Sequence, residues 1–420
     1  MTAKVRAGRW PLPRFSYQPS GSTVACMKAL TWQGIQDVRI EEVPDPTIEA
    51  PTDAIVRVTS TAICGSDLHL YSVLAPYLTA GDILGHEFMG IVEDVGAEVS
   101  NLRVGDRVVV PFNISCGHCW MCDRQLFAQC ETTQNVQQGK GASLFGYTSL
   151  YGAVPGGQAD LVRVPHADFG PIVVPTEHAD ERYLYLSDIL PTAWQGVVYA
   201  DVPQEGTLAV IGAGPVGQLA IRSALHRGIG DVIAVDLVPE RLETAHAAGA
   251  RTIDLNESVD VVQALVDMTQ GRGPDSVLEA VGMEAHGNPV VAKVISAIGR
   301  LPGPVARKAV ETAGLDRLAA LHTAIAAVRR GGTVSISGVY GGNADPMPMM
   351  DMFDKGLTIR MGQCHVRRWT DELLDIVNQP DDVLGLESLA THRVSLTEAP
   401  QMYGTFQRKD DGCLKVVMTP

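Results

Sequence analysis

The pattern of hydrophobic and polar residues changes character near Leu190. Before this residue, short runs rich in β-branched and apolar residues alternate with turn residues such as Asp45-Pro46 and Gly105-Asp106, as is typical of strands joined by tight turns. The predicted strands are Met27–Trp32, Val38–Val43, Ala54–Ser60, Phe88–Val95 and Arg107–Val110. We therefore expect an antiparallel, barrel-like region in the first part of the chain.

Beyond Leu190, short apolar runs alternate with runs that have a helical period. The predicted strands are Thr207–Ile211, Asp231–Val235, Arg251–Asp254, Ser276–Ala280, Thr333–Ser337 and, as a further candidate, Leu357–Met361. The predicted helices are the run that ends near Arg227, Pro239–Ala248, Val259–Thr269 and Leu315–Val328. This alternation predicts βαβ units and a doubly wound parallel sheet. From His365 to Pro420 the elements are short and mixed, with a strand at Leu414–Met418.

Three segments do not fit this alternation. Residues 1–26 contain four basic residues and no acidic one, loosely the composition of a transit peptide. We favour a disordered or non-native extension, because a strand is predicted directly afterwards.

Gln137–Gly157 is rich in Gly, Ser and Tyr and is predicted to be a long functional or partner-facing loop. We interpret His286–Gly314 as an insertion of unknown role.

Charge and cysteine content narrow the class of protein. The chain has 420 residues and a formal net charge of −15, which argues against binding to nucleic acid or to an anionic membrane. It contains no apolar run of about 18 residues, the length of a membrane-spanning helix. Eight cysteines without a secretory segment indicate metal binding in a reducing, cytoplasmic compartment.

A glycine motif follows the first strand of the predicted parallel sheet. It comprises Gly212, Gly214, Pro215, Val216 and Gly217, and it opens a predicted helix. In this context the glycines allow a tight turn and a close approach to a pyrophosphate.

An acidic residue, Asp236, ends the second strand of the same predicted sheet. Its carboxylate can accept hydrogen bonds from the adenosine ribose and repel a 2′-phosphate, so we predict NAD rather than NADP. Arg241 lies either near the ribose or a phosphate, or on a solvated helix face.

Four cysteines, Cys116, Cys119, Cys122 and Cys130, fall within one short segment. Their spacing predicts a closed, structural zinc site. Two disulfides are an alternative that the compartment disfavours. A nucleic-acid-binding zinc ribbon is another, and the acidic charge counts against it.

A second set of metal-binding residue types is dispersed. Cys64 offers a thiolate, and Ser66 and His69 follow it with groups that can pass on a proton. His86 and Glu87 form a short Gly-His-Glu motif. Asp188 is either a third zinc ligand or an ordinary helix-capping residue.

Taken together, these motifs resemble those of the medium-chain, zinc-dependent alcohol dehydrogenase family over nearly all of Met27–Pro420. The resemblance implies a Rossmann domain (190–364) inserted in a mostly β, GroES-like catalytic domain (27–189 and 365–420). It also implies two zinc ions per chain and NAD as the cofactor. Cys64, His86 and Asp188 would bind the catalytic zinc, with Glu87 as an alternate ligand.

The resemblance also implies roles for the neighbouring residues. Ser66 and His69 would form a proton relay, Asp67 would orient the His86 ring, and Thr192 would lie near the nicotinamide. Many members have Cys where Asp188 stands, and the branch with Asp resembles formaldehyde dehydrogenases and dismutases. A small primary alcohol or aldehyde adduct is therefore the expected substrate, oxidised by a homodimer or homotetramer. A polyol or threonine-type dehydrogenase and a non-catalytic, zinc-stabilised NAD-binding protein are the alternatives.

Overall fold

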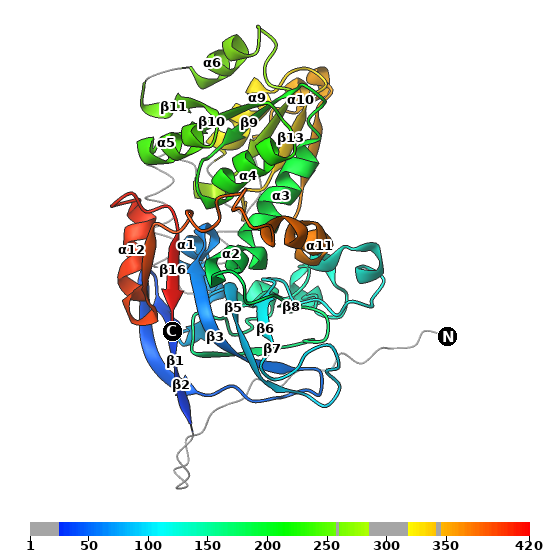
Figure 1. The fold of residues 1–420 in the computed structure, drawn as a ribbon. Coiled ribbons are helices and arrows are strands. Elements are labelled where there is room, and N and C mark those ends of the chain that lie inside the picture. The colour runs from blue at the N-terminus through cyan, green and yellow to red at the C-terminus, as the bar shows by residue number, and fades with distance from the viewer. Residues whose placement is uncertain (1–24, 258–259, 285–317, 342–345) are drawn as a thin grey trace.

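The computed structural model of the chain describes residues 25–257, 260–284, 318–341 and 346–420. The described strands form three sheets, arranged in two parts that lie one above the other in Figure 1. Residues 1–24 of the predicted extension 1–26 and all of the predicted insertion 286–314 lie outside the described residues. None of the helices in the described ranges combines the length and the apolar character that a membrane crossing requires.

The lower part in Figure 1 is built on a mostly antiparallel sheet of seven strands. Its order is β15-β16-β3-β5-β6-β8, with β7 also paired to β3. The strands are β3 (Ala54–Ile63), β5 (Glu87–Val95), β6 (Arg107–Val110), β7 (Leu161–Val164), β8 (Ile172–Val173), β15 (His392–Ser395) and β16 (Val416–Thr419). A three-stranded sheet of β1 (Cys26–Gly34), β2 (Asp37–Pro44) and β4 (Asp82–Ile83) adjoins it. Because β16 pairs with β3, the C-terminal strand returns to the part of the fold that the first strands form.

The upper part contains a parallel sheet of six strands in the order β11-β10-β9-β12-β13-β14. Its strands are β9 (Thr207–Ile211), β10 (Asp231–Asp236), β11 (Arg251–Asp254), β12 (Ser276–Glu279), β13 (Thr333–Ile336) and β14 (Thr358–Met361). Alternate residues of β9 pack in two different hydrophobic cores. Leu208 and Val210 pack in one hydrophobic core, and Ala209 and Ile211 in the other. The sheet is therefore buried on both faces, as its continuous apolar strands predict.

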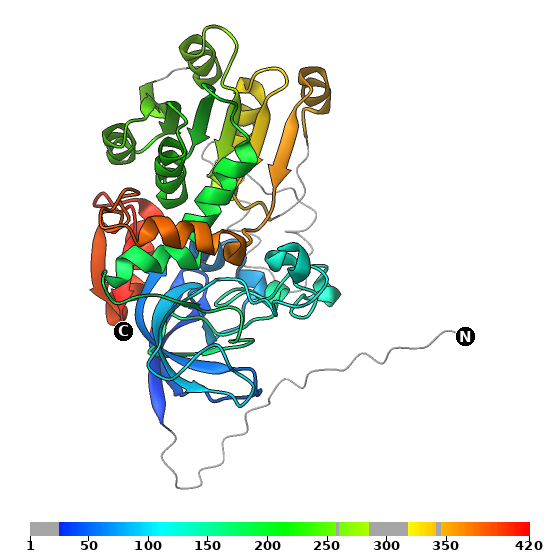
Figure 2. The same cartoon turned by 45° about the vertical axis from the view of Figure 1, so that its right-hand side comes forward.

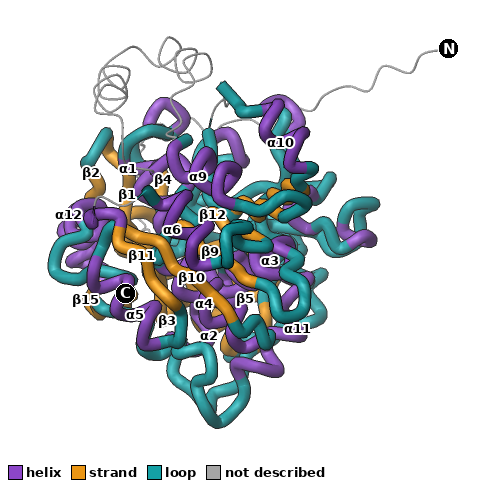
Figure 3. The backbone as a smooth tube through the Cα atoms, turned by 90° about the horizontal axis from the view of Figure 1, so that it is seen from above, coloured by secondary structure: helices purple, strands orange, loops and turns teal. Residues whose placement is uncertain are grey.

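Helices cover both faces of this sheet, as Figure 2 shows. Side chains of α3, α4 and α5 pack in the core of one face, and those of α6 and α9 in the core of the other. Seen from above, the strands cross the molecule as a twisted layer with helices along them (Figure 3). The helices are α1 (Gly65–Tyr71), α2 (Asp180–Leu184), α3 (Ile189–Ala200), α4 (Pro215–His226), α5 (Pro239–Ala247), α6 (Val261–Met268), α9 (Ala319–Ala327), α10 (Met349–Lys355), α11 (Val366–Val377) and α12 (Ala399–Arg408).

The α/β class and the parallel sheet are confirmed, with element ends that differ from the prediction by a few residues. The segment 137–157 is more ordered than a plain loop, since it contains the 3-10 turn Ser149–Tyr151 and a bridge between Phe145 and Val154. The first strand begins at Cys26, one residue before the predicted start. The domain boundaries themselves stay predictions.

Candidate active site

The register of two neighbouring strands brings the Cys64 and His86 segments together. Ala62 of β3 pairs with Glu87 of β5 in an antiparallel ladder, so the residue after β3 and the residue before β5 lie at the same edge. Cys64 is also the N-terminal capping residue of α1. Asp188 is likewise the N-terminal capping residue of α3, but its side chain forms no capping hydrogen bond. Its carboxylate is therefore available to the group formed by Cys64 and His86.

The four predicted donors meet in one buried group. Asp188 Oδ2 lies 3.3 Å from His86 Nε2 and 3.5 Å from Cys64 Sγ. One ligand atom from each of Cys64, His86, Glu87 and Asp188 lies within 4.8 Å of the others. This spacing and this mixture of sulfur, nitrogen and oxygen suit a zinc ion.

Asp67 contacts two of these residues from behind. Its Oδ1 lies 3.1 Å from His86 Nδ1, and its Oδ2 accepts a hydrogen bond of 2.9 Å from the Cys64 backbone N–H. The Nδ1 contact turns Nε2 of His86 toward Asp188 and Cys64. Carboxylate support of this kind fixes the orientation of a metal-binding imidazole.

Electrostatics also favour a cation at this position. Burial, together with the negative charges of Glu87 and Asp188, raises the pKa of the Cys64 thiol to about 12. Burial alone would raise the pKa of Asp188, but the hydrogen bond and charge of His86 hold it below its usual value. A divalent cation would neutralise the carboxylate and thiolate together, so the residues present fit the zinc that the sequence predicts.

Glu87 has a second partner, which the sequence analysis did not identify. The Lys415 Nζ atom lies 2.7 Å from both Glu87 carboxylate oxygens and donates to the Ile63 carbonyl at 3.0 Å. Both side chains are fully buried. The charge of Glu87 raises the pKa of Lys415 against the effect of burial, so we describe the two as an ion pair.

The two predicted relay residues lie on α1, next to the group formed by Cys64, His86, Glu87 and Asp188. The Ser66 hydroxyl lies 3.1 Å from His86 Nε2. Ser66 and His69 both line the cavity described below. A hydroxyl in this position can contact a substrate oxygen held near Cys64 and His86.

The four clustered cysteines form a separate site. Their sulfur atoms lie within 4.8 Å of one another, and each thiol is free. Burial would raise the pKa of Cys119, but hydrogen bonds from the Cys122 and Glu131 backbone lower it to about 6. The arrangement fits a structural zinc and does not contain the disulfides that were the alternative.

The glycine turn has the geometry of a nucleotide-binding loop. Gly212 has φ +92°, a conformation that side chains rarely adopt. A Cβ atom at Gly217 would overlap the Gly212 carbonyl oxygen, so α4 packs too closely for any other residue. A Cβ at Gly214 would lie 3.5 Å from Arg241 Nη1, which places the Arg241 guanidinium beside the turn.

Asp236 supports the same turn from the end of β10. Its Oδ2 accepts a hydrogen bond of 2.6 Å from the Ala213 N–H, and its Oδ1 accepts from Leu237 and Val238 at 2.7 and 2.9 Å. These bonds fix the carboxylate at the edge of the cavity, the position that a ribose-binding acid requires.

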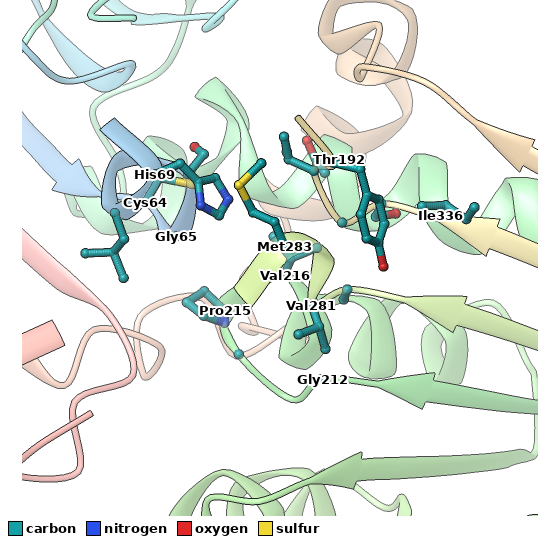
Figure 4. A pocket seen from close by; sticks show the side chains of 18 of the residues that line it. Cys64, Gly65, His69, Thr192, Gly212, Pro215, Val216, Val281, Met283 and Ile336 are labelled. Carbon is teal, nitrogen blue, oxygen red and sulfur yellow. The ribbon is translucent and has the colours of Figure 1, made fainter. Parts of the chain in front are cut away.

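One cavity of about 830 Å³ joins the two halves of the site. Figure 4 shows Cys64 and His69 on one side and Gly212 and Pro215 on the other, with Met283 between them. Val216, Asp236 and Arg241 also line this cavity, as do His86 and Asp188. Thr192, which is predicted to lie near the cofactor, also lines this cavity. Its hydroxyl donates a hydrogen bond of 2.8 Å to Asp188 Oδ1.

The segment that follows β14 carries residues that sequence reasoning missed. Gln195 Oε1 accepts hydrogen bonds from the His365 N–H and from Trp369 Nε1, at 3.0 and 3.1 Å. His365 Nδ1 accepts the Ala128 N–H at 3.1 Å. These bonds attach the segment that follows β14 to α3 and to the four-cysteine segment. They thereby hold Cys364, which lines the cavity. No local sequence pattern predicts them.

A doubly wound parallel sheet and a buried Cys-His-Asp group on one cavity define a zinc-dependent dehydrogenase. Residues 50–175 match the alcohol dehydrogenase GroES-like domain, and residues 215–300 match the zinc-binding dehydrogenase domain. The chain belongs to the medium-chain, zinc-dependent alcohol dehydrogenase family, and it is an oxidoreductase of that type. This confirms the predicted fold class, a Rossmann sheet joined to a GroES-like domain.

Three relatives illustrate the similarity. The chain is 38% identical over 401 residues to an uncharacterized zinc-type alcohol dehydrogenase-like protein, AdhB, of Bacillus subtilis, covering 94% of this chain and 100% of the relative. It is 30% identical to a glutathione-independent formaldehyde dehydrogenase of Pseudomonas aeruginosa, over 90% of this chain and 94% of the relative. Alcohol dehydrogenase TADH from Thermus sp. ATN1 has a similar structure, with TM-score 0.76, 35% identity and coverage of 94% and 99%.

Proposed function

We propose that this chain oxidises a primary alcohol, or a hydrated or adducted aldehyde such as formaldehyde hydrate, with zinc and NAD. The observation that carries the proposal is the shared cavity, which is lined both by Cys64, His86 and Asp188 and by the glycine turn with Asp236. When bound there, zinc supplies a Lewis acid for the substrate oxygen and the nicotinamide supplies a hydride acceptor. Two zinc ions per chain are proposed, one in each cluster.

The chain's own residues supply position and proton transfer. Ser66 accepts the proton of the substrate hydroxyl, and His69, further along α1, passes it to solvent. Asp67 holds the His86 ring in place, and Thr192 holds the Asp188 carboxylate. Glu87 is proposed to serve as an alternate ligand, with Lys415 holding its carboxylate while it is not bound to the metal.

Cofactor choice is proposed to rest on Asp236, with Arg241 near the adenosine ribose or a phosphate. The carboxylate of Asp236 is fixed by three backbone N–H groups and would face a 2′-phosphate at short range. Like charges so placed disfavour NADP, so NAD is the proposed cofactor.

Self-association into a dimer or tetramer is also proposed, in the cytoplasm. It is supported by apolar residues on α10 and on β14, the last strand in the order of the parallel sheet. Met350, Phe353 and Met361 are 72%, 83% and 61% exposed. A second copy of the chain would cover them, and light scattering of the wild type and of Phe353→Glu tests this.

The function is tested by NADH formation with zinc-replete protein. The panel consists of ethanol, benzyl alcohol, sorbitol, threonine, and formaldehyde with and without glutathione. We expect turnover with a primary alcohol or with formaldehyde, and faster turnover with NAD than with NADP. Turnover with sorbitol or threonine alone would favour the alternative dehydrogenases, and no turnover with any compound would contradict the proposal.

A further inference from the structure

One side of the cavity is built from apolar and aromatic side chains of three separate segments. We call this the aromatic wall, and it consists of Tyr77, Phe112, Leu144, Tyr147, Leu150 and Tyr151, all of which line the same cavity as Cys64 and His86. Four of the six come from the segment 137–157. This segment is therefore part of the cavity and not a peripheral loop.

The aromatic wall lies directly against a proposed zinc ligand. The rings of Phe112 and Tyr147 meet the His86 ring edge-on, with centroids 6.3 and 6.2 Å away. Tyr151 packs on Tyr147 at 5.7 Å. The aromatic surface thus extends outward from the position where a substrate oxygen would be held.

Hydrogen bonds give the aromatic wall a fixed shape. Ser149 Oγ donates to the Tyr77 carbonyl at 2.8 Å, and the Phe145 N–H donates to the Phe112 carbonyl at 3.1 Å. Within the segment, the Leu144 N–H donates to the Tyr151 carbonyl at 3.1 Å. A surface held in this way is preorganised, so its shape can discriminate between substrates.

The aromatic wall carries hydroxyl groups but no charged group. The hydroxyls belong to Tyr77, Tyr147 and Tyr151, and Tyr151 is hydrogen bonded to Gln363, which also lines the cavity. Lys140 lines the cavity as well, from an exposed position outside the aromatic wall. The ammonium and carboxylate groups of an amino-acid alcohol would find no counter-charge on the aromatic wall, so this surface favours an uncharged substrate body.

We infer that the substrate is a primary alcohol with an aromatic or similarly bulky apolar body, and that Tyr147 and Tyr151 determine this specificity. The inference rests on the proposed function. The reaction is RCH₂OH + NAD⁺ → RCHO + NADH + H⁺, where R is an aryl or arylalkenyl group. Formaldehyde hydrate has no such group and would leave the aromatic wall uncovered. Burying a phenyl-sized group favours binding by about 10- to 100-fold.

The test compares kcat/KM for cinnamyl and benzyl alcohol with kcat/KM for ethanol, formaldehyde and sorbitol. We expect the aromatic alcohols to exceed the others by at least about 10-fold. If formaldehyde or sorbitol is the best substrate, the inference is wrong while the proposed dehydrogenase function stands. If none of the compounds is oxidised, the proposed function fails and the inference fails with it.

Variants assign the specificity to residues. Tyr147→Ala and Tyr151→Ala should each lower the ratio of kcat/KM for cinnamyl alcohol to that for ethanol by about 10-fold. The control is Val136→Ala, an exposed residue just before the segment, which should leave the ratio unchanged. Calorimetric titration of cinnamyl alcohol without NAD gives a second readout, and its Kd should rise by a similar factor in both variants. An unchanged ratio and an unchanged Kd in both would overturn the assignment.

Discussion

The Lys415 Nζ atom lies 2.7 Å from both carboxylate oxygens of Glu87, and both side chains are fully buried. The pair connects the residue just before β16 to the residue that follows His86. Burying two charges is unfavourable unless each satisfies the other. The ion pair therefore stabilises the junction of β3, β5 and β16 next to the proposed zinc site.

Removing one partner of this pair should destabilise the fold. Lys415→Met leaves the Glu87 carboxylate buried without a counter-charge, and we expect a loss of about 3–5 kcal/mol in the free energy of unfolding. Urea denaturation followed by circular dichroism measures it. The double variant Glu87→Gln/Lys415→Met should recover at least half of the loss, and Lys28→Met, at an exposed position, should lose almost nothing. Equal losses in the single and double variants would contradict the account.

The Lys415 contact also shows what sequence reasoning can and cannot reach. The glycine turn and the four-cysteine cluster were predictable because the residues of each lie close together along the chain. Lys415 reaches Glu87 only because β16 pairs with β3, with Val416 opposite Ile63. No local pattern encodes that pairing.

The proposed ligand Asp188 and the aromatic wall show the same division between local patterns and contacts made by the fold. Asp188 was identified by resemblance, while from its local sequence it could equally have been a helix cap. The position of Tyr147 against His86 depends on the path of a segment whose composition indicated only a loop. The elements themselves were predictable because period-two and apolar patterns are local, and the contacts between them are not.

His365 should make stability depend on pH. Burial lowers the pKa of His365 to about 4, below its ordinary value near 6.5. Between these values the unfolded chain binds more protons than the folded chain, so stability is lost as the pH falls from about 6.5 to 4. The contribution is at most about 3 kcal/mol, since one pKa unit corresponds to about 1.4 kcal/mol.

A matched variant isolates this contribution. His365→Asn keeps an acceptor for the Ala128 N–H but does not titrate. Urea midpoints between pH 4 and pH 7 should therefore fall less steeply with acid in the variant than in the wild type. Identical slopes would show that His365 is not the source.

Asp236 should control cofactor choice. Asp236→Asn removes the negative charge but keeps an oxygen that can accept the Ala213 N–H. We expect the ratio of kcat/KM with NADP to that with NAD to rise by about 100-fold, or roughly 2.7 kcal/mol. Asp254→Asn, on the neighbouring strand opposite Asp236, is the control. An unchanged ratio in Asp236→Asn would remove Asp236 from the account of specificity.

Ser66 should transfer the substrate proton. Ser66→Ala should lower kcat by about 100-fold, the lower end of the range for positioned proton transfer, while the zinc content stays the same. Stopped-flow measurement of NADH formation separates this step from product release. The matched control is Ser72→Ala. Ser72 follows directly after α1, and its hydroxyl donates a hydrogen bond to the Leu68 carbonyl. Equal rates for the two variants would argue against the relay.

Cys64, His86 and Asp188 are proposed to bind a catalytic zinc, and the four clustered cysteines a structural one. The most direct test is the number of zinc ions per chain, measured by mass spectrometry of the native protein. We expect two in the wild type, two in Asp188→Cys, where a thiolate replaces the carboxylate, and one in the double variant Cys64→Ala/His86→Ala, which leaves only the two carboxylates of the group. One zinc ion in the wild type, or two in the double variant, would show that Cys64 and His86 do not bind a second zinc ion.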